Sequence, residues 1–323
     1  MCLAINRIKI TFVFTVITFA CQSQVLAESG VSEFINFLPS GVETIIAVNN
    51  PEKIKAKSKK HLFNLVLPIY PGINIMNVDL PDEKPTISSS SVACMLQSCQ
   101  RIKESEYESP RFHMSSIYKL KPGQAPILFE SLSRKADRSH RIYGIDVWKS
   151  NIDTTESKGT YFTFLDDLLV ISTKGSLANE MVSNILSGKM NKVTTNWQEI
   201  KNIDLSSEYF AVRHYSKSNS VKYWSETDMA FVNDEYVTGL SIVPESNKWT
   251  KARVLYFSKN PSMFQSYLRS VTGAPIHPTK KSFEFNLVSK SPNCNVYDLY
   301  SPSEDARANL FIVFSWLLGF LPI

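Results

Sequence analysis

The stretch from Ser116 to Lys119 has the spacing of a serine nucleophile activated by a lysine one helical turn away, as used by penicillin-binding enzymes. That chemistry needs helical geometry, because residues three apart share a face in a helix and not in a strand. The run from Ser116 to Leu120 is typical of a strand, and the companion motifs of those enzymes are missing from the sequence. We therefore interpret the spacing as a coincidence.

His214, Arg213 and Asp228 are the residues that come nearest to a catalytic set. His214 falls at the end of a predicted strand, on the face of Phe210 and Val212, with Arg213 beside it. A histidine base needs a nucleophile and an orienting acid, which the sequence does not place. Asp228 belongs to an acidic cluster that lacks the glycine and the spacing of a calcium loop, formed by Glu226, Asp228, Asp234 and Glu235. We therefore expect His214 to have a structural role and the acidic cluster to be the solvated rim of a hairpin.

Asp166 and Asp167 could be a pair of carboxylates for acid and base chemistry. Neighbouring residues of a strand point to opposite faces, however, and aspartate tolerates the backbone of a tight turn. The pair separates an aromatic run from the run Leu168 to Ile171. We predict a hairpin turn at these two residues.

Motifs for metals and cofactors are absent from the sequence. The histidines at positions 61, 113, 140 and 277 show no HExxH or other ligand spacing, so we expect no metal site and no zinc. GxSxG, GxxxxGK[ST] and GxGxxG are missing as well, so we expect no nucleotide or other cofactor. The sequence leans away from an enzyme.

The first 27 residues have the pattern of an export signal. Arg7 and Lys9 precede an uninterrupted apolar run from Ile10 to Ala20, and small or slim side chains end at Ala27, ahead of Glu28. We predict cleavage between Ala27 and Glu28 and a periplasmic or secreted product. The alternative is a lipidated Cys21, although Thr18 and Phe19 fit a lipoprotein motif poorly.

The mature chain would keep three cysteines: Cys94, Cys99 and Cys294. An oxidising compartment allows one disulfide, and the four residues between Cys94 and Cys99 could close a small loop. We predict that disulfide, with Cys294 left over. Once Arg7 and Lys9 are removed, the mature chain has 33 basic and 30 acidic residues and a net charge of +3. This small excess does not indicate a basic surface that binds nucleic acid.

Strand, cap and helix signals recur along the chain. Predicted strands at 42–48, 116–120, 168–172 and 253–257 each lead into helical spacing, with Asn50 and Ser176 as helix caps and Gly188 as a stop. Further strands are predicted at 142–148, 209–215 and 283–287, and hairpins at 161–172 and 229–243. The fold class is α+β, an antiparallel sheet with helices on one face. Residues 115–189 and 208–273 match in order and suggest a duplicated module.

The predicted organisation is a signal (1–27), a first half (28–195) with a long loop excursion at 68–110, and a second half (196–323). The tail contains an uncharged apolar segment, Leu310 to Phe320, which we interpret as a helix that closes the core. We expect a non-enzymatic exported binding or scaffolding protein with a protein, peptide or envelope ligand. The alternatives are an exported hydrolase with a site of scattered residues, and a protein tethered to the membrane by that apolar segment.

Overall fold

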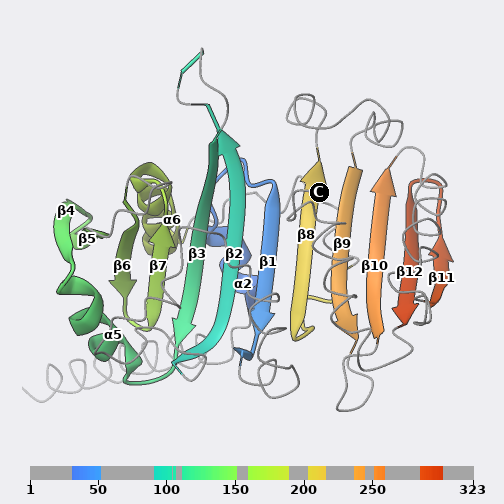
Figure 1. Ribbon diagram of the computed structural model, residues 1–323, viewed down its shortest axis with the longest axis horizontal. Coiled ribbons are helices and arrows are strands. Elements are labelled where there is room, and N and C mark those ends of the chain that lie inside the picture. The colour runs from blue at the N-terminus through green and yellow to red at the C-terminus, as the bar shows by residue number, and fades with distance from the viewer. Residues whose placement is uncertain are drawn as a thin grey trace, which may run out of the picture.

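The computed structural model describes residues 31–51, 91–103, 105–106, 111–150, 159–188, 203–215, 236–243, 251–258 and 284–300. Within them, twelve strands form one sheet in the order β11-β12-β10-β9-β8-β1-β2-β3-β7-β6-β5-β4 (Figure 1). Every neighbouring pair is antiparallel. The expected class, an antiparallel sheet combined with helices, is confirmed.

The strands are β1 (Thr44–Asn49), β2 (Val92–Ile102), β3 (Arg111–Leu120), β4 (Ala136–Ile142), β5 (Ile145–Ser150), β6 (Tyr161–Leu165), β7 (Leu168–Ser172), β8 (Tyr209–Tyr215), β9 (Tyr236–Val243), β10 (Lys251–Ser258), β11 (Glu284–Lys290) and β12 (Cys294–Tyr300). The described helices are α2 (Val31–Phe34), the short 3-10 helix η1 (Ile35–Phe37), α5 (Gln124–Ser133) and α6 (Gly175–Ser187).

The pairing of β1 with β8 divides the sheet into two series that follow the same rule. On one side β1, β2 and β3 lie in chain order and are followed by β7 and then β6; on the other, β8, β9 and β10 are followed by β12 and then β11. These series begin at β1 and β8, whereas the module expected from the sequence begins at β3 and β8. The halves predicted to meet near residues 191–201 thus share one sheet, and their duplication stays a prediction.

One face of the sheet packs against α2, η1 and α6. Period-2 alternation sends Ile45 and Ala47 of β1 to this face, where they join a buried cluster with Phe210 and Val212 of β8. Met181 and Val182 of α6 belong to the same cluster. Figure 1 shows α2 and α6 on the same side of the strands. Burial of these apolar side chains is the main force that holds the helices to the sheet.

Helix α5 lies on the opposite face. Its Phe129 contacts Phe164 of β6 at a ring separation of 5.7 Å, while the next residue, Leu165, belongs to the cluster that contains α6. Adjacent residues of a strand point to opposite faces. The expectation of helices on one face is therefore wrong for α5.

The loop excursion predicted at 68–110 is wrong over its second part, because it contains β2. This eleven-residue strand lies between β1 and β3 near the middle of the sheet. Both of its faces are buried, from Val92 to Gln100 apart from Ala93, so its sequence shows no alternation of apolar and polar residues.

The strand predicted at 142–148 is a hairpin. Ile142 ends β4, Ile145 begins β5, and the two residues between them, Tyr143 and Gly144, have positive φ values of 47° and 84°. Positive φ at both central positions is the geometry of the two-residue turn that suits twisted strands. Strand β4 was therefore missed, and its partner was placed too early.

Other local predictions are confirmed: β7 and β8 have the predicted bounds, and Asp166 and Asp167 form the turn between β6 and β7, with Asp166 at a φ of 52°. Helix α6 ends at Gly188, which has a φ of 59°. Its cap, however, is Lys174 and not Ser176, which lies in the first turn. The backbone N–H of Lys174 donates to Ser172 Oγ over 3.2 Å.

Several predictions lie outside the described residues. They are the signal with Ala27 and Glu28, the lipidation alternative at Cys21, the helices expected after Asn50 and Asn260, the residues of the 229–243 hairpin before Tyr236, and the apolar segment from Leu310 to Phe320.

Candidate functional site

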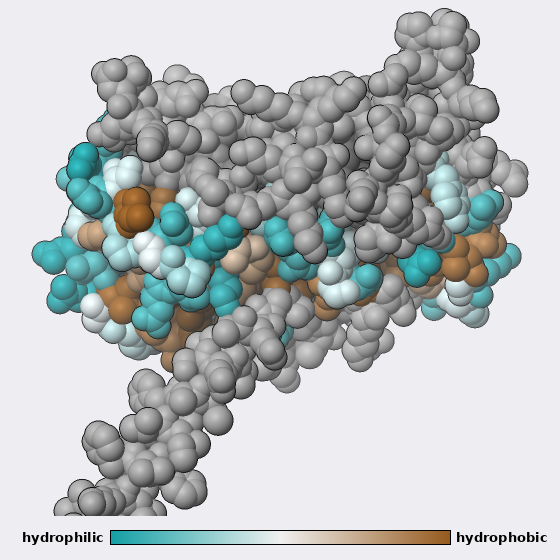
Figure 2. Space-filling model, turned by 90° about the horizontal axis from the view of Figure 1, so that it is seen from below, coloured by the Kyte–Doolittle hydropathy of each residue, from teal (hydrophilic) through white to brown (hydrophobic). Residues whose placement is uncertain are grey.

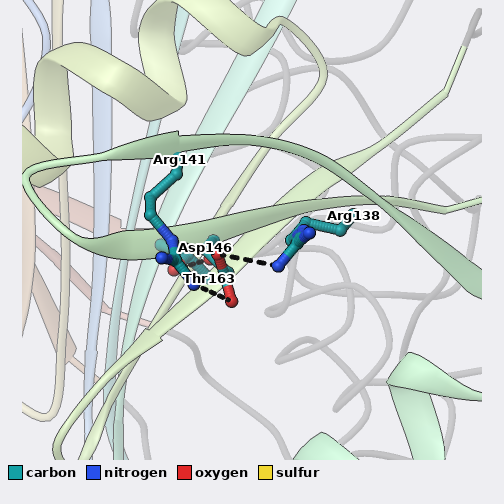
Figure 3. Close-up of polar contacts among 4 residues, drawn as sticks. All are labelled: Arg138, Arg141, Asp146 and Thr163. Carbon is teal, nitrogen blue, oxygen red and sulfur yellow. Dashed lines mark hydrogen bonds and ion pairs between the residues drawn. The ribbon is translucent and has the colours of Figure 1, made fainter.

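The β4–β5 hairpin presents two arginines around one carboxylate. Arg141 and Asp146 are directly opposed across the strands, and Arg138 lies on the same face. Arg141 Nε donates to Asp146 Oδ1 over 2.7 Å and Arg141 Nη2 to Oδ2 over 3.4 Å, while Arg138 Nη1 lies 3.9 Å from Oδ1 (Figure 3). Thr163 of β6 donates to the backbone oxygen of Asp146 over 2.8 Å. That bond joins β5 to β6 beyond their short ladder.

The charge around Asp146 is not balanced. Hydrogen bonds from Arg141 lower the pKa of Asp146, and the same bonds raise the pKa of Arg141. Asp146 therefore neutralises one of the two guanidinium groups. Both arginine side chains are about 60 % exposed, at 60 % for Arg138 and 59 % for Arg141, so the pairs themselves are screened by solvent.

An aromatic cluster lies on the same face of the sheet. Phe129 of α5 meets Trp148 of β5 edge to face at 5.5 Å and Phe164 at 5.7 Å, and Phe164 meets Phe162 at 6.3 Å. Edge-to-face contacts of this kind add to the energy of simple burial. Phe129 still leaves 38 % of its surface exposed.

Together these residues form what we call the Arg–aromatic surface: Phe129, Arg138, Arg141 and Trp148. Figure 2 shows apolar side chains among hydrophilic ones at its left end, which is the end occupied by β4, β5 and α5 in Figure 1. Residues 134–149 carry five basic and two acidic residues. Aromatic and arginine side chains are the types enriched where proteins bind partners, and guanidinium groups pair well with carboxylates.

The structure separates the residues that the sequence offered as a catalytic set. Arg213 and His214 are neighbours in β8 and so lie on opposite faces. Arg213 is opposite Thr44 of β1, and the backbone N–H of His214 donates to Glu43 O over 2.8 Å. Asp228 lies outside the described residues. The two that are described do not converge on one site.

Ser116 and Lys119 do not converge either. Both belong to β3, three residues apart, so their side chains point to opposite faces. Lys119 Nζ lies 4.0 Å from Asp167 Oδ2 of the hairpin turn. Ser116 is buried and hydrogen bonds with Tyr118, the pKa of which burial raises to about 12.

The predicted disulfide between Cys94 and Cys99 is not formed. Both residues belong to β2, and five residues of extended strand span roughly 16 Å, whereas the Cα atoms of a disulfide lie about 4.4–6.8 Å apart. Cys94 shares the face of Leu96, and Cys99 lies on the other face, opposite Thr44. The sequence spacing suggested a loop because β2 itself was missed.

A buried ladder of hydroxyl groups was also missed: Ser98, Ser115 and Ser172, one from each of β2, β3 and β7. Ser115 Oγ lies 3.0 Å from Ser172 Oγ, Ser172 Oγ lies 3.1 Å from Met114 O, and Ser98 Oγ donates to Ser115 O over 3.4 Å. All three are at most 3 % exposed. The bonds satisfy buried polar groups, so the ladder is structural. The only sign of the ladder in the sequence is a serine in each of the three strands. These serines can be matched to one another only when the order of the strands in the sheet is known.

Among the described residues, no group of three or more His, Cys, Asp or Glu side chains could hold a metal ion. Within the same ranges, no helix is long and apolar enough to cross a bilayer. No family model, no curated protein and no solved structure matches this chain.

Proposed function

We propose that the protein is an exported, non-enzymatic binding or scaffolding protein of the cell envelope, and that the Arg–aromatic surface engages a protein partner. The observation that carries this proposal is the exposure of apolar side chains beside guanidinium groups on one rigid face. Phe129 is 38 % exposed, Trp148 is half-buried, and Arg138 Nη1 lies 3.9 Å from Asp146 Oδ1.

The chemistry of the surface indicates the kind of partner. Burial of Phe129 and Trp148 would supply hydrophobic free energy, and the excess positive charge would favour a carboxylate-rich rim on the partner. The surface rests on paired strands and on edge-to-face aromatic contacts, so its side chains are held in place before binding. A preformed surface loses less entropy when a partner binds.

Site-specific photo-crosslinking in cells of the producing organism tests the proposal. A photoreactive phenylalanine analogue in place of Phe129 should give a discrete adduct with a protein. The double variant Arg138→Gln and Arg141→Gln should lower the adduct yield about 3- to 10-fold, as expected when two exposed charge pairs are lost. Lys103→Gln, an exposed lysine elsewhere in the chain, is the matched control and should leave the yield unchanged.

The proposal fails if no adduct forms at position 129. It also fails if the double variant, with an unchanged thermal midpoint, gives the same adduct yield as the parent protein.

A further inference from the structure

The two arginines of the Arg–aromatic surface share a face because β4 is bulged. Arg138 and Arg141 are three residues apart, and residues at that spacing in a regular strand point to opposite faces. In the structure, however, Arg138 is opposite Trp148 and Arg141 is opposite Asp146, and these two partners are two residues apart in β5. The register shifts just after Arg138, where β4 has one residue more than β5. The bulge therefore brings both guanidinium groups to Asp146 (Figure 3).

Ser139 is the extra residue of the bulge, and its side chain contacts that of the next residue. Ser139 Oγ lies 3.1 Å from His140 Nδ1. Adjacent side chains of a regular strand point to opposite faces, so this contact fits a bulge and not a continuous ladder. His140 itself is opposite Val147, and by alternation both lie on the face away from the arginines.

Helix α6 holds the ring of this histidine. His140 Nε2 lies 2.6 Å from Asn179 Oδ1, and Nε2 is the donor because an amide oxygen only accepts. The second ring nitrogen is thereby directed toward Ser139. Met181 and Val182 hold α6 in the buried cluster on the sheet. Two successive hydrogen bonds thus connect a helix that is packed on the sheet to the bulge in β4.

A second register is open to the first residues of β4. Without the bulge, the pairs from His140 onward would be unchanged, but Ser139 would stand opposite Trp148 and Arg138 opposite Lys149. Arg138 would then point away from the rest of the Arg–aromatic surface. Ser139 and His140 would also point to opposite faces, and their hydrogen bond would be lost. This hydrogen bond therefore favours the bulged register.

We propose that Ser139, His140 and Asn179 are positioning residues of the Arg–aromatic surface: their hydrogen bonds hold the bulge, and the bulge places Arg138 beside Arg141. The proposal rests on the function proposed above for this surface. Asp146 neutralises one of the two guanidinium groups, so the excess positive charge exists on this face only while both arginines are there. A carboxylate-rich partner is selected by that excess.

Cysteine crosslinks across β4 and β5 report the register without any partner. Ala136 is opposite Ser150 in the bulged register, whereas Asp137 would be opposite Ser150 without the bulge. Directly opposed residues have the Cα separation of a disulfide. Ala136→Cys with Ser150→Cys should therefore oxidise faster than Asp137→Cys with Ser150→Cys, as read by peptide mapping. Adding Ser139→Ala to both pairs should lower the ratio of the two rates about 3- to 10-fold, as expected for one lost hydrogen bond.

The photo-crosslinking yield from position 129 reports the effect on binding. Ser139→Ala and Asn179→Ala should each lower the adduct yield about threefold, whereas Ser133→Ala, which removes a side-chain hydrogen bond on α5, should not. Deletion of Ser139 should keep the parent yield, because plain alternation then sets Arg138 on the face of Arg141.

A rescue separates positioning from simple stabilisation of the fold. In the chain that lacks Ser139, Asn179→Ala should no longer lower the adduct yield, since no bulge has to be held. A residue that only stabilises the fold would lower the yield equally with and without Ser139.

The two measurements fail in different ways. An unchanged ratio of crosslinking rates in Ser139→Ala overturns the proposal, whether or not a partner is found. A changed ratio together with the parent adduct yield overturns it too, because the register would then not matter for binding. Absence of any adduct from the parent chain defeats the proposed function instead, and the crosslinking ratio still decides whether these residues hold the bulge.

Discussion

Cys94 and Cys99 stand in the same strand and point to opposite faces of the sheet. Cys94 is opposite Asn49 of β1, and Cys99 is opposite Thr44. Since no disulfide joins them, unfolding the protein in urea without a reductant should allow both to take up a maleimide label, which intact mass measures. In the native protein Cys94 should react slowly, because burial raises the pKa of its thiol to about 11. A mass that shows label at Cys94 and Cys99 only after reduction would contradict this geometry.

The stability of the fold should fall at alkaline pH. Burial raises the pKa of Cys94 from 9.0 to about 11 and that of Tyr118 from 10.0 to about 12, and it also raises the pKa of Tyr209. Above pH 9 the unfolded chain loses these protons while the folded chain keeps them, so unfolding becomes more favourable as pH rises. The stabilisation is complete below pH 9 and is lost as pH rises through the folded-state values.

Urea midpoints measured from pH 7 to pH 11 test this sign. Tyr118→Phe removes one of the buried acids and should flatten the fall above pH 10. Tyr143→Phe, at an exposed turn, is the control and should leave the slope unchanged. A midpoint that rises between pH 9 and pH 11 is incompatible with the expected sign.

Gly239 and Ile203 should behave as a coupled pair. A Cβ on Gly239 of β9 would lie 2.9 Å from Ile203 Cγ1 and closer still to Cδ1, and Ile203 is buried. We expect Gly239→Ala to destabilise the protein by about 1–3 kcal/mol through overpacking. Ile203→Val removes Cδ1, so the double variant should be more stable than the sum of the two single changes predicts. If the changes in unfolding free energy of the two single variants simply add in the double variant, the contact between Gly239 and Ile203 does not affect stability.

Two ion pairs should differ in their contribution to stability. Arg253 Nε donates to Asp298 Oδ1 over 3.0 Å across β10 and β12, and the Asp298 side chain is 7 % exposed. Asp298→Asn should cost about 1–2 kcal/mol, since it removes the charge from a buried hydrogen bond. Asp167→Asn alters a 4.0 Å pair with a half-exposed carboxylate and should change stability by less than about 0.5 kcal/mol. Equal effects in chemical denaturation would refute the distinction.

Glycine should be needed at position 188 because of its backbone conformation, and not because a larger side chain would lack space. It caps α6 with a φ of 59°, and a Cβ there would meet nothing within 4 Å. Gly188→Ala should lower the free energy of unfolding by about 1 kcal/mol, whereas Gly188→Asn should lose less because asparagine tolerates this conformation. Thermal unfolding of the two variants tests the order; an alanine variant as stable as the parent would contradict it.

Local structure could be predicted where one run of residues determines it. Strand β7 is a continuous apolar run, and the turn at Asp166 and Asp167 contains residue types that tolerate its backbone. Strand β2 could not be recognised, because both of its faces are buried and it includes Ser98, Gln97 and Gln100 among its buried residues. The polarity of such a strand is set by hydrogen bonds to neighbours that the sequence does not identify.

The candidate site could not be predicted, because its parts come from separate elements. Phe129 belongs to α5, Trp148 to β5 and Phe164 to β6, and only the pairing of β5 with β6 brings their rings together. Arg138 and Arg141 both lie ahead of the single strand predicted at 142–148, so their common face did not appear. The turn at Gly144 was the one available signal for the hairpin.

The pairing of β1 with β8 also constrains how the chain reaches its native state. Thr44 of β1 lies directly opposite Arg213 of β8. The pairing of these two strands therefore joins segments that the ribosome makes far apart in time. Contacts of such long sequence separation slow folding, because a large loop must close before they gain free energy. Until β8 arrives, β1 lacks one neighbour, and a nascent chain that ends before Tyr209 should depend on chaperones to stay soluble.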